Sequence, residues 1–386
     1  YDTGLQYLPL DRWDTDYALT LNLYSGKSEV LFLLEKFTES ESEFQHVVDR
    51  CKSPFDKARV YNTKLTLYLN ENRTLDAYKS GKIALNFLKI KITSHPKQWK
   101  IVLEFLKSKI KLPKTFSATD LALFPETKNG DIQLIIDLLM NLTAPAYYLD
   151  KNLFALIVLK TVTISKTHGN VSASAHAYAT YGVLLGSVFN NYTLGHKFGL
   201  LSINLNKRFN DKKMASKLNF IFGALLNHWT QPAKTSLPYF IAGYTYGIEC
   251  GDYTYAGNSA LSYLIFQLYL GIPIPDIVTT YDTYSSFLKR VKDEHVIWRT
   301  KLVQDYCSIL VGNLTIFDHS FYIEKLKPLQ GQVAWAQYLL FNMQINFLFG
   351  KYAKAVTSGN DAYKLKDALL GQIYRIDLIF YHAISI

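Results

Sequence analysis

The 386 residues are 49% hydrophobic and 15% aromatic, which excludes a disordered chain because enough apolar side chains are present to form a core. A net charge of +10 suits nucleic acid, an anionic membrane or an acidic partner. The basic residues are scattered, however, so ordinary solvated faces are favoured over a nucleic-acid footprint. Three widely spaced cysteines argue against a disulfide framework, and no apolar run reaches the roughly 18 residues of a membrane span. We therefore expect a cytoplasmic protein.

Residues 1–110 predict helical hairpins joined by short polar turns. Ser25-Gly26-Lys27-Ser28 is expected to form one such turn, and Ser53-Pro54 to open a helix. The second helix of this hairpin carries small residues on one face. They would let the first helix, which begins at Ser53-Pro54, approach closely, as in tetratricopeptide repeats. This small-residue stripe occurs three times, the second time loosely: Ala77, Gly81 and Ala84; Gly195, Gly199 and Ser202; Ala355, Gly359 and Ala362.

Residues 111–130 are predicted to connect two helical blocks, because Pro113, Pro125 and Gly130 lie among polar residues. Helices are expected over 131–148 and 152–166, and strand patterns are nearly absent. The central block, 131–290, contains a unit that recurs every 41 residues.

The 41-residue period is marked by three polar pairs, Gly169-Asn170, Asn210-Asp211 and Gly251-Asp252. In that register, equivalent positions hold similar residues: Ala175, Ser216 and Gly257; Tyr181, Phe222 and Tyr263; Gly182, Gly223 and Leu264; Leu184, Leu225 and Phe266. Small and aromatic side chains at fixed positions are what stacked helix pairs require. The repeats are therefore predicted to pack on one another.

The C-terminal block, 291–386, is predicted to end with a hairpin around Phe349-Gly350-Lys351. The whole chain is thus expected to be an all-α, tetratricopeptide-like α-solenoid of antiparallel helix hairpins forming a right-handed superhelix. The chain lacks an initiator Met, and its last residues follow an apolar helical pattern without a stop signal. We expect a longer parent protein.

Catalytic motifs are missing from the sequence. Gly26-Lys27-Ser28 imitates the end of a phosphate-binding loop, but Leu21 occupies the position of the first glycine. The histidines are dispersed without metal-ligand spacing, and Cys250 is better explained as a small buried residue than as a nucleophile. We expect no enzyme activity, cofactor or metal in this chain, and any catalysis would belong to other parts of the parent.

A polar column is the candidate binding surface. His176, Lys217 and Asn258 recur at the repeat spacing, and Asn227 and His228 form a second group. Polar side chains inside a solenoid groove suit hydrogen bonding to an extended peptide or an acidic segment. A simply hydrated groove is the competing interpretation. If the column binds a partner, Lys217→Glu should weaken binding without unfolding the protein.

Several segments resemble the helical-repeat region of very large signalling proteins. They are Leu8-Pro9-Leu10-Asp11-Arg12-Trp13, Tyr17-Ala18-Leu19-Thr20-Leu21, Asp56-Lys57-Ala58-Arg59-Val60-Tyr61, Asn152-Leu153-Phe154-Ala155-Leu156 and Gly223-Ala224-Leu225-Leu226-Asn227-His228-Trp229. In that family, a serine/threonine-kinase-like domain and an ATPase module precede the repeats, and a sensor histidine kinase commonly follows. The resemblance implies a regulatory spacer or sensor segment, because the family's catalytic motifs belong to the flanking domains.

Three functions remain open from the sequence. The first is a non-catalytic regulatory or scaffolding module that binds a protein, a peptide or flanking domains of its own parent. The second is a sensing domain that binds a small molecule or peptide and controls an attached ATPase, kinase or transcription activator, and for a small molecule this predicts a deep pocket with convergent polar groups. The third is a helical enzyme.

Overall fold

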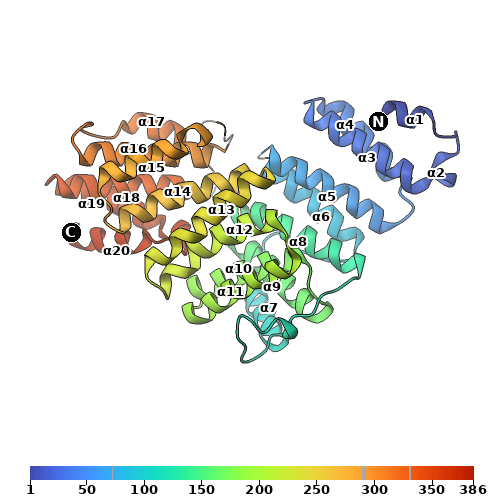
Figure 1. The fold of residues 1–386 in the computed structure, drawn as a ribbon, viewed down its shortest axis with the longest axis horizontal. Helices are drawn as coiled ribbons and strands as arrows, with labels where there is room; N and C mark the ends of the chain where they lie inside the picture. The colour runs from blue at the N-terminus through green and yellow to red at the C-terminus, as the bar shows by residue number, and fades with distance from the viewer. Residues whose placement is uncertain (72, 289, 291–292, 330–331) are drawn as a thin grey trace. The chain divides into compact units, whose positions relative to one another are not determined.

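Helices make up nearly all of the secondary structure in the computed structural model, which describes residues 1–71, 73–288, 290, 293–329 and 332–386 (Figure 1). Within these residues, 18 helices have at least seven residues, and the β-structure is one isolated bridge between Glu126 and Asn170. Most contacts run between consecutive helices. The predicted all-α helical repeat is confirmed, whereas the right-handed superhelix stays a prediction.

The chain forms two compact units. Unit 1 comprises Tyr1–Pro113 and Glu126–Val171, and unit 2 comprises Lys114–Pro125 and Ser172–Ile386. These boundaries differ from the predicted segments 1–110, 111–130, 131–290 and 291–386. The expected connector is divided between the units, the predicted central block is divided after Val171, and the predicted C-terminal block is part of unit 2.

Unit 1 is a series of antiparallel helix pairs, α3 with α4, α5 with α6 and α8 with α9 (Figure 1). Its helices are α1 (Asp2–Gln6), α2 (Arg12–Thr15), α3 (Tyr17–Leu33), α4 (Phe37–Arg50), α5 (Pro54–Asn70), α6 (Thr74–Phe87), α7 (Gln98–Lys111), α8 (Gly130–Leu149) and α9 (Lys151–His168). Ser53 caps α5 as predicted, because its side chain accepts a hydrogen bond from the Asp56 backbone N–H.

The turn predicted at Ser25-Gly26-Lys27-Ser28 is wrong, because α3 continues through it. Two contacts explain why the polar residues do not break the helix. The Ser28 hydroxyl donates to the Tyr24 carbonyl of the preceding turn at 2.8 Å. A Cβ at Gly26 would lie 2.5 Å from the Tyr1 ring, so the glycine makes room for that ring.

Helix α8 is long and apolar enough to cross a membrane by length and composition. A core helix passes the same test, and α8 packs against α6 and α9 with residues such as Leu138, Leu139 and Leu142 fully buried. Its hydrophobicity is therefore accounted for by the core of unit 1. Pro145 lies inside this helix.

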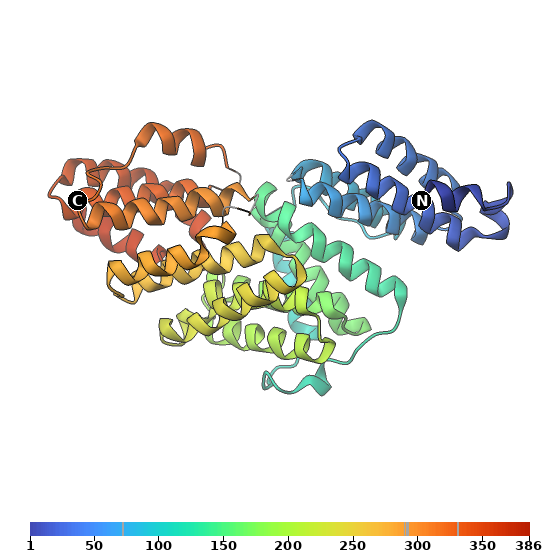
Figure 2. The ribbon, with the colours of Figure 1, turned by 45° about the horizontal axis from the view of Figure 1, so that its top comes forward.

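Unit 2 continues the pairing of helices (Figure 2). Its elements are η1 (Leu121–Leu123), α10 (Ser172–Ser187), α11 (Tyr192–Phe209), α12 (Lys212–Ile221), η2 (Phe222–Leu226), η3 (Asn227–Trp229), η4 (Ala233–Ser236), α13 (Leu237–Cys250), α14 (Tyr253–Tyr269), α15 (Ile274–Leu288), α16 (Glu294–Leu310), α17 (His319–Leu326), α18 (Val333–Leu348), α19 (Tyr352–Lys364), η5 (Lys366–Leu369) and α20 (Arg375–Ser385).

The 41-residue register is confirmed by the helix ends. Gly169, Asn210 and Gly251 each follow the last residue of a helix with a positive φ, of 100°, 53° and 72°. Such residues end helices because glycine, and to a lesser extent asparagine, tolerates the left-handed region. Asp211 and Asp252 then cap α12 and α14 through their side chains.

The small-residue stripes also lie where the sequence predicts them. A Cβ on Gly195 of α11 would come within 2.6 Å of the Gly182 carbonyl oxygen of α10. Gly81 of α6 faces Leu65 of α5, and Gly359 of α19 faces the preceding α18. The three pairs therefore pack closely because the second helix has no side chain at the point of contact.

The segment Lys114–Pro125 belongs to unit 2 because α11 binds it. The Asn204 side chain donates to the Ala118 carbonyl at 3.1 Å. Arg208 donates to the Leu121 and Phe124 carbonyls at 3.2 and 2.7 Å. These bonds occupy carbonyl groups of a segment with little regular structure of its own.

Candidate functional site

The predicted polar column lies on the first helix of each repeat, but its members are poorly accessible. His176 on α10 is 5% exposed, and the Lys217 side chain on α12 is 19% exposed. Asn258 on α14 is half-buried, and its side chain donates to the Thr254 carbonyl of its own helix at 2.9 Å. Whether these residues bind a partner stays a prediction.

Burial shifts the pKa values of both His176 and Lys217. Burial, with a smaller contribution from the Lys217 charge, lowers the pKa of His176 to about 3, so the imidazole is neutral near pH 7. Its Nδ1 has no hydrogen-bond partner in the described part of the chain. Burial also lowers the pKa of Lys217, and the Asp252 carboxylate, 4.0 Å from Nζ, opposes that change.

The surroundings of Lys217 make Lys217→Glu an unsuitable test of binding. The new carboxylate would be buried beside Asp252, and like charges at short range in a poorly solvated place are destabilising. Lys217 Nζ also lies 5.2 Å from the centre of the Tyr255 ring, a contact that glutamate would lose. We therefore expect this substitution to weaken folding, contrary to the expectation from the sequence.

The second predicted group lies where the helix geometry changes. After α12 ends at Ile221, η2 is a π-helical turn and η3 a 3₁₀ turn. Gly223 in the π turn faces the Phe240 ring, which a Cβ would approach to 2.8 Å. π turns are frequent at functional sites. Nothing in the local sequence distinguishes this turn from ordinary helix, and the sequence analysis missed it.

Asn227 links three elements from this irregular stretch. It is 3% exposed, and its Oδ1 lies 3.3 Å from Nε2 of His196 on α11. Its Nδ2 donates to the hydroxyls of Thr235 and Ser236 at 2.7 and 3.1 Å. The amide is thus used within the protein, and its direct role is to hold η3 against α11 and η4.

His228 and Trp229 pack beside the loop at Gly371. Burial lowers the pKa of His228 to about 4, and the nearby Gly223 and Gly371 carbonyls oppose this only in part. Neither ring nitrogen has a hydrogen bond of good geometry within the described residues. The Trp229 indole N–H donates to the Gly371 carbonyl at 3.1 Å. This group therefore joins residues that are 142 positions apart in the sequence.

The sequence analysis missed a buried polar group near the C-terminus. Arg299 is 9% exposed and donates from Nε to Gln337 Oε1 at 2.7 Å and from Nη2 to the Tyr374 hydroxyl at 3.1 Å. Gln344 donates to Asp377 at 2.7 Å, and burial raises the pKa of that carboxyl. The two hydrogen-bond partners of Arg299 are neutral, so its charge is stabilised by dipoles.

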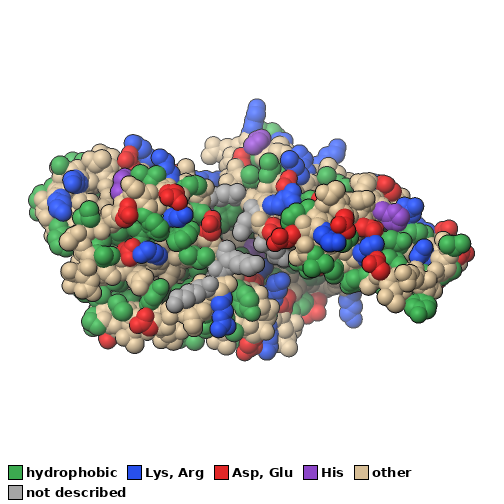
Figure 3. Space-filling model, turned by 90° about the horizontal axis from the view of Figure 1, so that it is seen from above, with side chains coloured by type: hydrophobic (Ala, Val, Ile, Leu, Met, Phe, Trp, Pro, Cys, Tyr) green, Lys and Arg blue, Asp and Glu red, His purple; other side chains and the backbone are tan. Residues whose placement is uncertain are grey.

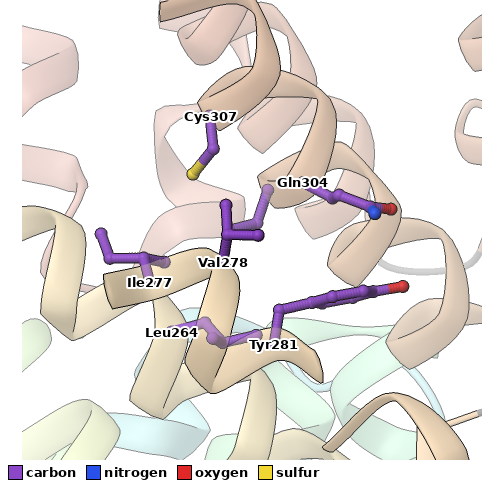
Figure 4. A pocket seen from close by; sticks show the side chains of 7 residues that line it. Leu264, Ile277, Val278, Tyr281, Gln304 and Cys307 are labelled. Atoms are coloured by element: carbon purple, nitrogen blue, oxygen red, sulfur yellow. The ribbon is translucent and has the colours of Figure 1, made fainter. Parts of the chain in front are cut away.

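Two hollows are present in unit 2. One, with a cavity volume of about 10 Å³, is lined by apolar parts of α14, α15 and α16, and the Cys307 thiol points towards Ile277 and Val278 (Figure 4). It is below the roughly 300 to 1,000 Å³ of typical ligand pockets. The other, of about 370 Å³, is widely open to solvent and is lined by Lys114, Thr115, Phe116, Asp120, Leu194 and Lys197. Neither is the deep, polar pocket that the small-molecule hypothesis predicts.

Charges of both signs are mixed on the surface. Figure 3 shows Lys and Arg side chains beside Asp and Glu, with hydrophobic side chains between them, over the face in view. Among the residues that the structure describes, no three His, Cys, Asp or Glu side chains are grouped so that they could hold a metal ion. The three cysteines are free thiols, with Cys51 and Cys307 buried.

The sequence is similar to part of a known signalling protein. Over 299 residues, which cover 72% of this chain, the sequence is 20% identical to the hybrid signal transduction histidine kinase G of Dictyostelium discoideum. The chain is a distant relative of a signalling histidine kinase. The similarity spans 9% of that protein's length. No protein-family model matches the sequence.

Proposed function

We propose that this chain is a regulatory and scaffolding segment of a larger signal-transduction protein, without catalytic activity of its own. The supporting observation is that the sequence resembles a small part of a signalling histidine kinase and folds as paired helices. Helical repeats present extended surfaces that suit protein or interdomain contacts. The proposed role is to hold, or respond to, neighbouring domains or a protein partner.

A candidate contact surface lies on α20. Ile376, Ile379 and Phe380 are each slightly more than half exposed. Their spacing of three and four residues places them on one face of the helix. An exposed apolar face of this kind suits contact with another polypeptide segment.

The experiment for this contact is site-specific photocrosslinking in the full-length gene product in cells. A photoreactive residue at Ile379 should crosslink to one defined segment, either of the same chain or of one partner protein. The same residue at Lys351, an exposed position at the start of α19, is the control. If Ile379 gives no crosslinks beyond those of Lys351, the α20 face is not a contact surface.

The absence of catalysis is tested separately. The purified 386-residue chain should neither release phosphate from ATP nor become labelled by it. Activity that copurifies with the folded chain through successive columns would contradict the proposal.

One observation favours small-molecule sensing as a second candidate. The amide atoms Gln337 Nε2 and Gln344 Oε1 are buried on α18 without a partner among the described residues, and Arg299 lies against Gln337. Unpartnered buried polar atoms are costly, and a small ligand could satisfy them. A thermal-shift screen with carboxylate and phosphate metabolites tests this. Stabilisation that Arg299→Met abolishes would support sensing, and no stabilisation would exclude it for these ligand classes.

A further inference from the structure

Helix α7 in unit 1 has an exposed apolar stripe. Trp99, Leu103, Leu106 and Ile110 are 60%, 46%, 51% and 80% exposed. Their spacings of four, three and four residues place them on one face of a helix. The helix packs mainly against α9, and its buried residues are Glu104 and Ser108. Glu104 is buried while the large apolar side chains face water, the reverse of the usual arrangement.

Lysines border this stripe on both sides. At 100° per residue, Lys100, Lys107 and Lys111 lie along one edge and Lys109 along the other. Residues 97–111 contain five lysines and one acidic residue, Glu104. The lysines are therefore in excess, although Lys107 lies 3.6 Å from the Glu104 carboxylate.

The ammonium groups of two of these lysines lie close to aromatic rings of α7. Lys100 Nζ is 5.6 Å from the Trp99 ring centre, and Lys109 Nζ is 5.7 Å from that of Phe105. A lysine in such a place can cover apolar surface with its methylene groups while its ammonium group reaches charged partners beyond the stripe.

We propose that α7 binds the surface of an anionic lipid bilayer. A helix at a membrane surface requires an apolar face with Trp or Leu and lysines at the boundary of that face, and α7 has both. Its opposite face, with Glu104 and Ser108 buried, packs against α9 and attaches the helix to unit 1. The excess of lysine complements the charge of anionic headgroups. The stripe forms a ridge on a convex helix, which a soft planar surface accepts without a preformed groove. A protein partner would need a groove with acidic residues along both edges.

The test is co-sedimentation of the full 386-residue chain with lipid vesicles. Vesicles of phosphatidylcholine alone are compared with vesicles containing about one third phosphatidylserine. We expect binding only to the anionic vesicles. About 1 M salt should weaken it strongly, because the Debye length falls from about 10 Å to about 3 Å.

Two double variants test the contributions of the lysines and of the apolar stripe separately. Lys109→Glu with Lys111→Glu should reduce partitioning about tenfold or more, since both favourable charges are reversed. Trp99→Ser with Leu106→Ser should reduce it to a similar extent by removing apolar contact area. All four side chains are exposed, so circular dichroism should show unchanged helix content.

Matched variants in the turn between α18 and α19 and in the first turn of α19 distinguish this surface from general effects of charge and hydrophobicity. Lys351→Glu with Lys354→Glu makes the same change in net charge, and Phe349→Ser with Tyr352→Ser removes exposed aromatic area. Neither should alter vesicle binding. The proposal is overturned if anionic vesicles are not bound, or if the matched variants lose binding equally.

A second copy of the chain could cover the apolar stripe of α7 in place of a membrane. Sedimentation velocity without lipid tests this alternative by showing whether the protein is a monomer or a dimer. A monomer that binds vesicles supports the proposal. A dimer that Trp99→Ser with Leu106→Ser dissociates, in a protein that ignores anionic vesicles, would assign the stripe to self-association and reject the membrane.

Discussion

The helix pair α10–α11 and the group α16, α18 and α20 belong to the same unit but are held together differently. In α10–α11, Gly182 and Gly195 meet backbone to backbone. In the C-terminal group, Arg299, Gln337 and Tyr374 form a buried hydrogen-bonded chain across the helices. The first contact depends on missing side chains, and the second on long polar ones.

This difference shows that a helical repeat does not fix the chemistry of its interfaces. A glycine contact tolerates no added atom, because the facing backbone cannot move aside. A polar chain tolerates changes of shape but not the loss of one partner, because the other is left buried and unpaired. Added side-chain atoms should therefore destabilise the glycine contact most, and removal of a side chain should destabilise the polar group most.

The largest expected effect is at the glycine contact. A Cβ at Gly182 would lie 2.6 Å from the Gly195 carbonyl oxygen, so Gly182→Leu should separate the helices and destabilise the protein by about 3 kcal/mol or more. Urea denaturation measures this. On the same helix, a Cβ at Gly186 meets the edge of the Tyr192 ring at 3.1 Å, and a ring can turn. Gly186→Ala should stay within about 1 kcal/mol of the parent, and an equal loss in both variants would contradict the backbone contact.

The second effect is at Arg299. Arg299→Ala should cost about 3 kcal/mol, because it leaves a cavity and unpaired oxygen atoms at Gln337 and Tyr374. Arg299→Met fills more of the space and should cost less. Adding Gln337→Leu to Arg299→Met should recover stability, since one of the unpaired groups is then removed. Strictly additive losses in the urea midpoints would show that the side chains do not interact.

A pH dependence is expected from the buried histidine of α10. The folded pKa of His176, about 3, is below the unfolded value of 6.5, so the unfolded chain takes up a proton first as the pH falls. The free energy of unfolding should therefore drop below about pH 6.5, by up to about 1.4 kcal/mol per pH unit, until the folded pKa is reached. His228, with a pKa of about 4, adds a change of the same sign.

Urea denaturation at about pH 7.5 and about pH 5 measures this slope. His176→Asn cannot titrate and should lose part of it. If the parent and the variant lose the same stability between the two pH values, His176 is not buried in the neutral form.

The smallest effect is expected at Ser216, in the repeat that follows α10–α11. Its hydroxyl donates to the Gly243 carbonyl on α13 at 2.8 Å, whereas the equivalent residue of α10 is Ala175. Ser216→Ala should cost about 1 kcal/mol, the typical worth of one hydrogen bond. A loss of stability as large as that of Gly182→Leu would contradict this estimate. It would mean that the position shared by Ala175, Ser216 and Gly257 tolerates a change of side chain no better than the backbone contact does.

The sequence predicted the features that depend on local chemistry. Gly251 and Asn210 end helices, and Asp211 and Asp252 begin the next ones, because turn geometry and capping are encoded within a few residues. Gly195 indicated a close contact because only glycine admits another backbone at that distance. These signals fixed the 41-residue register and the pairing of helices.

The remaining features depend on residues distant in sequence. The turn expected at Gly26 is absent because Tyr1 packs against an unbroken helix. A polar column at repeat spacing did not reveal that His176 and Lys217 are buried, because burial is decided by neighbouring helices. Arg299 was missed because its partners, Gln337 and Tyr374, are 38 and 75 residues away.

The bonds from Asn204 and Arg208 to residues 118–124 affect how this chain can be divided. The polypeptide enters unit 2 at Lys114, returns to unit 1 at Glu126 and leaves it again after Val171. Many repeat proteins can be shortened by removing whole repeats from an end. Here a single cut between Pro125 and α8 would leave each fragment with parts of both units. Expression of unit 2 by itself should therefore require Lys114–Pro125 to be joined to Ser172–Ile386, because a truncation that starts at Ser172 lacks this segment.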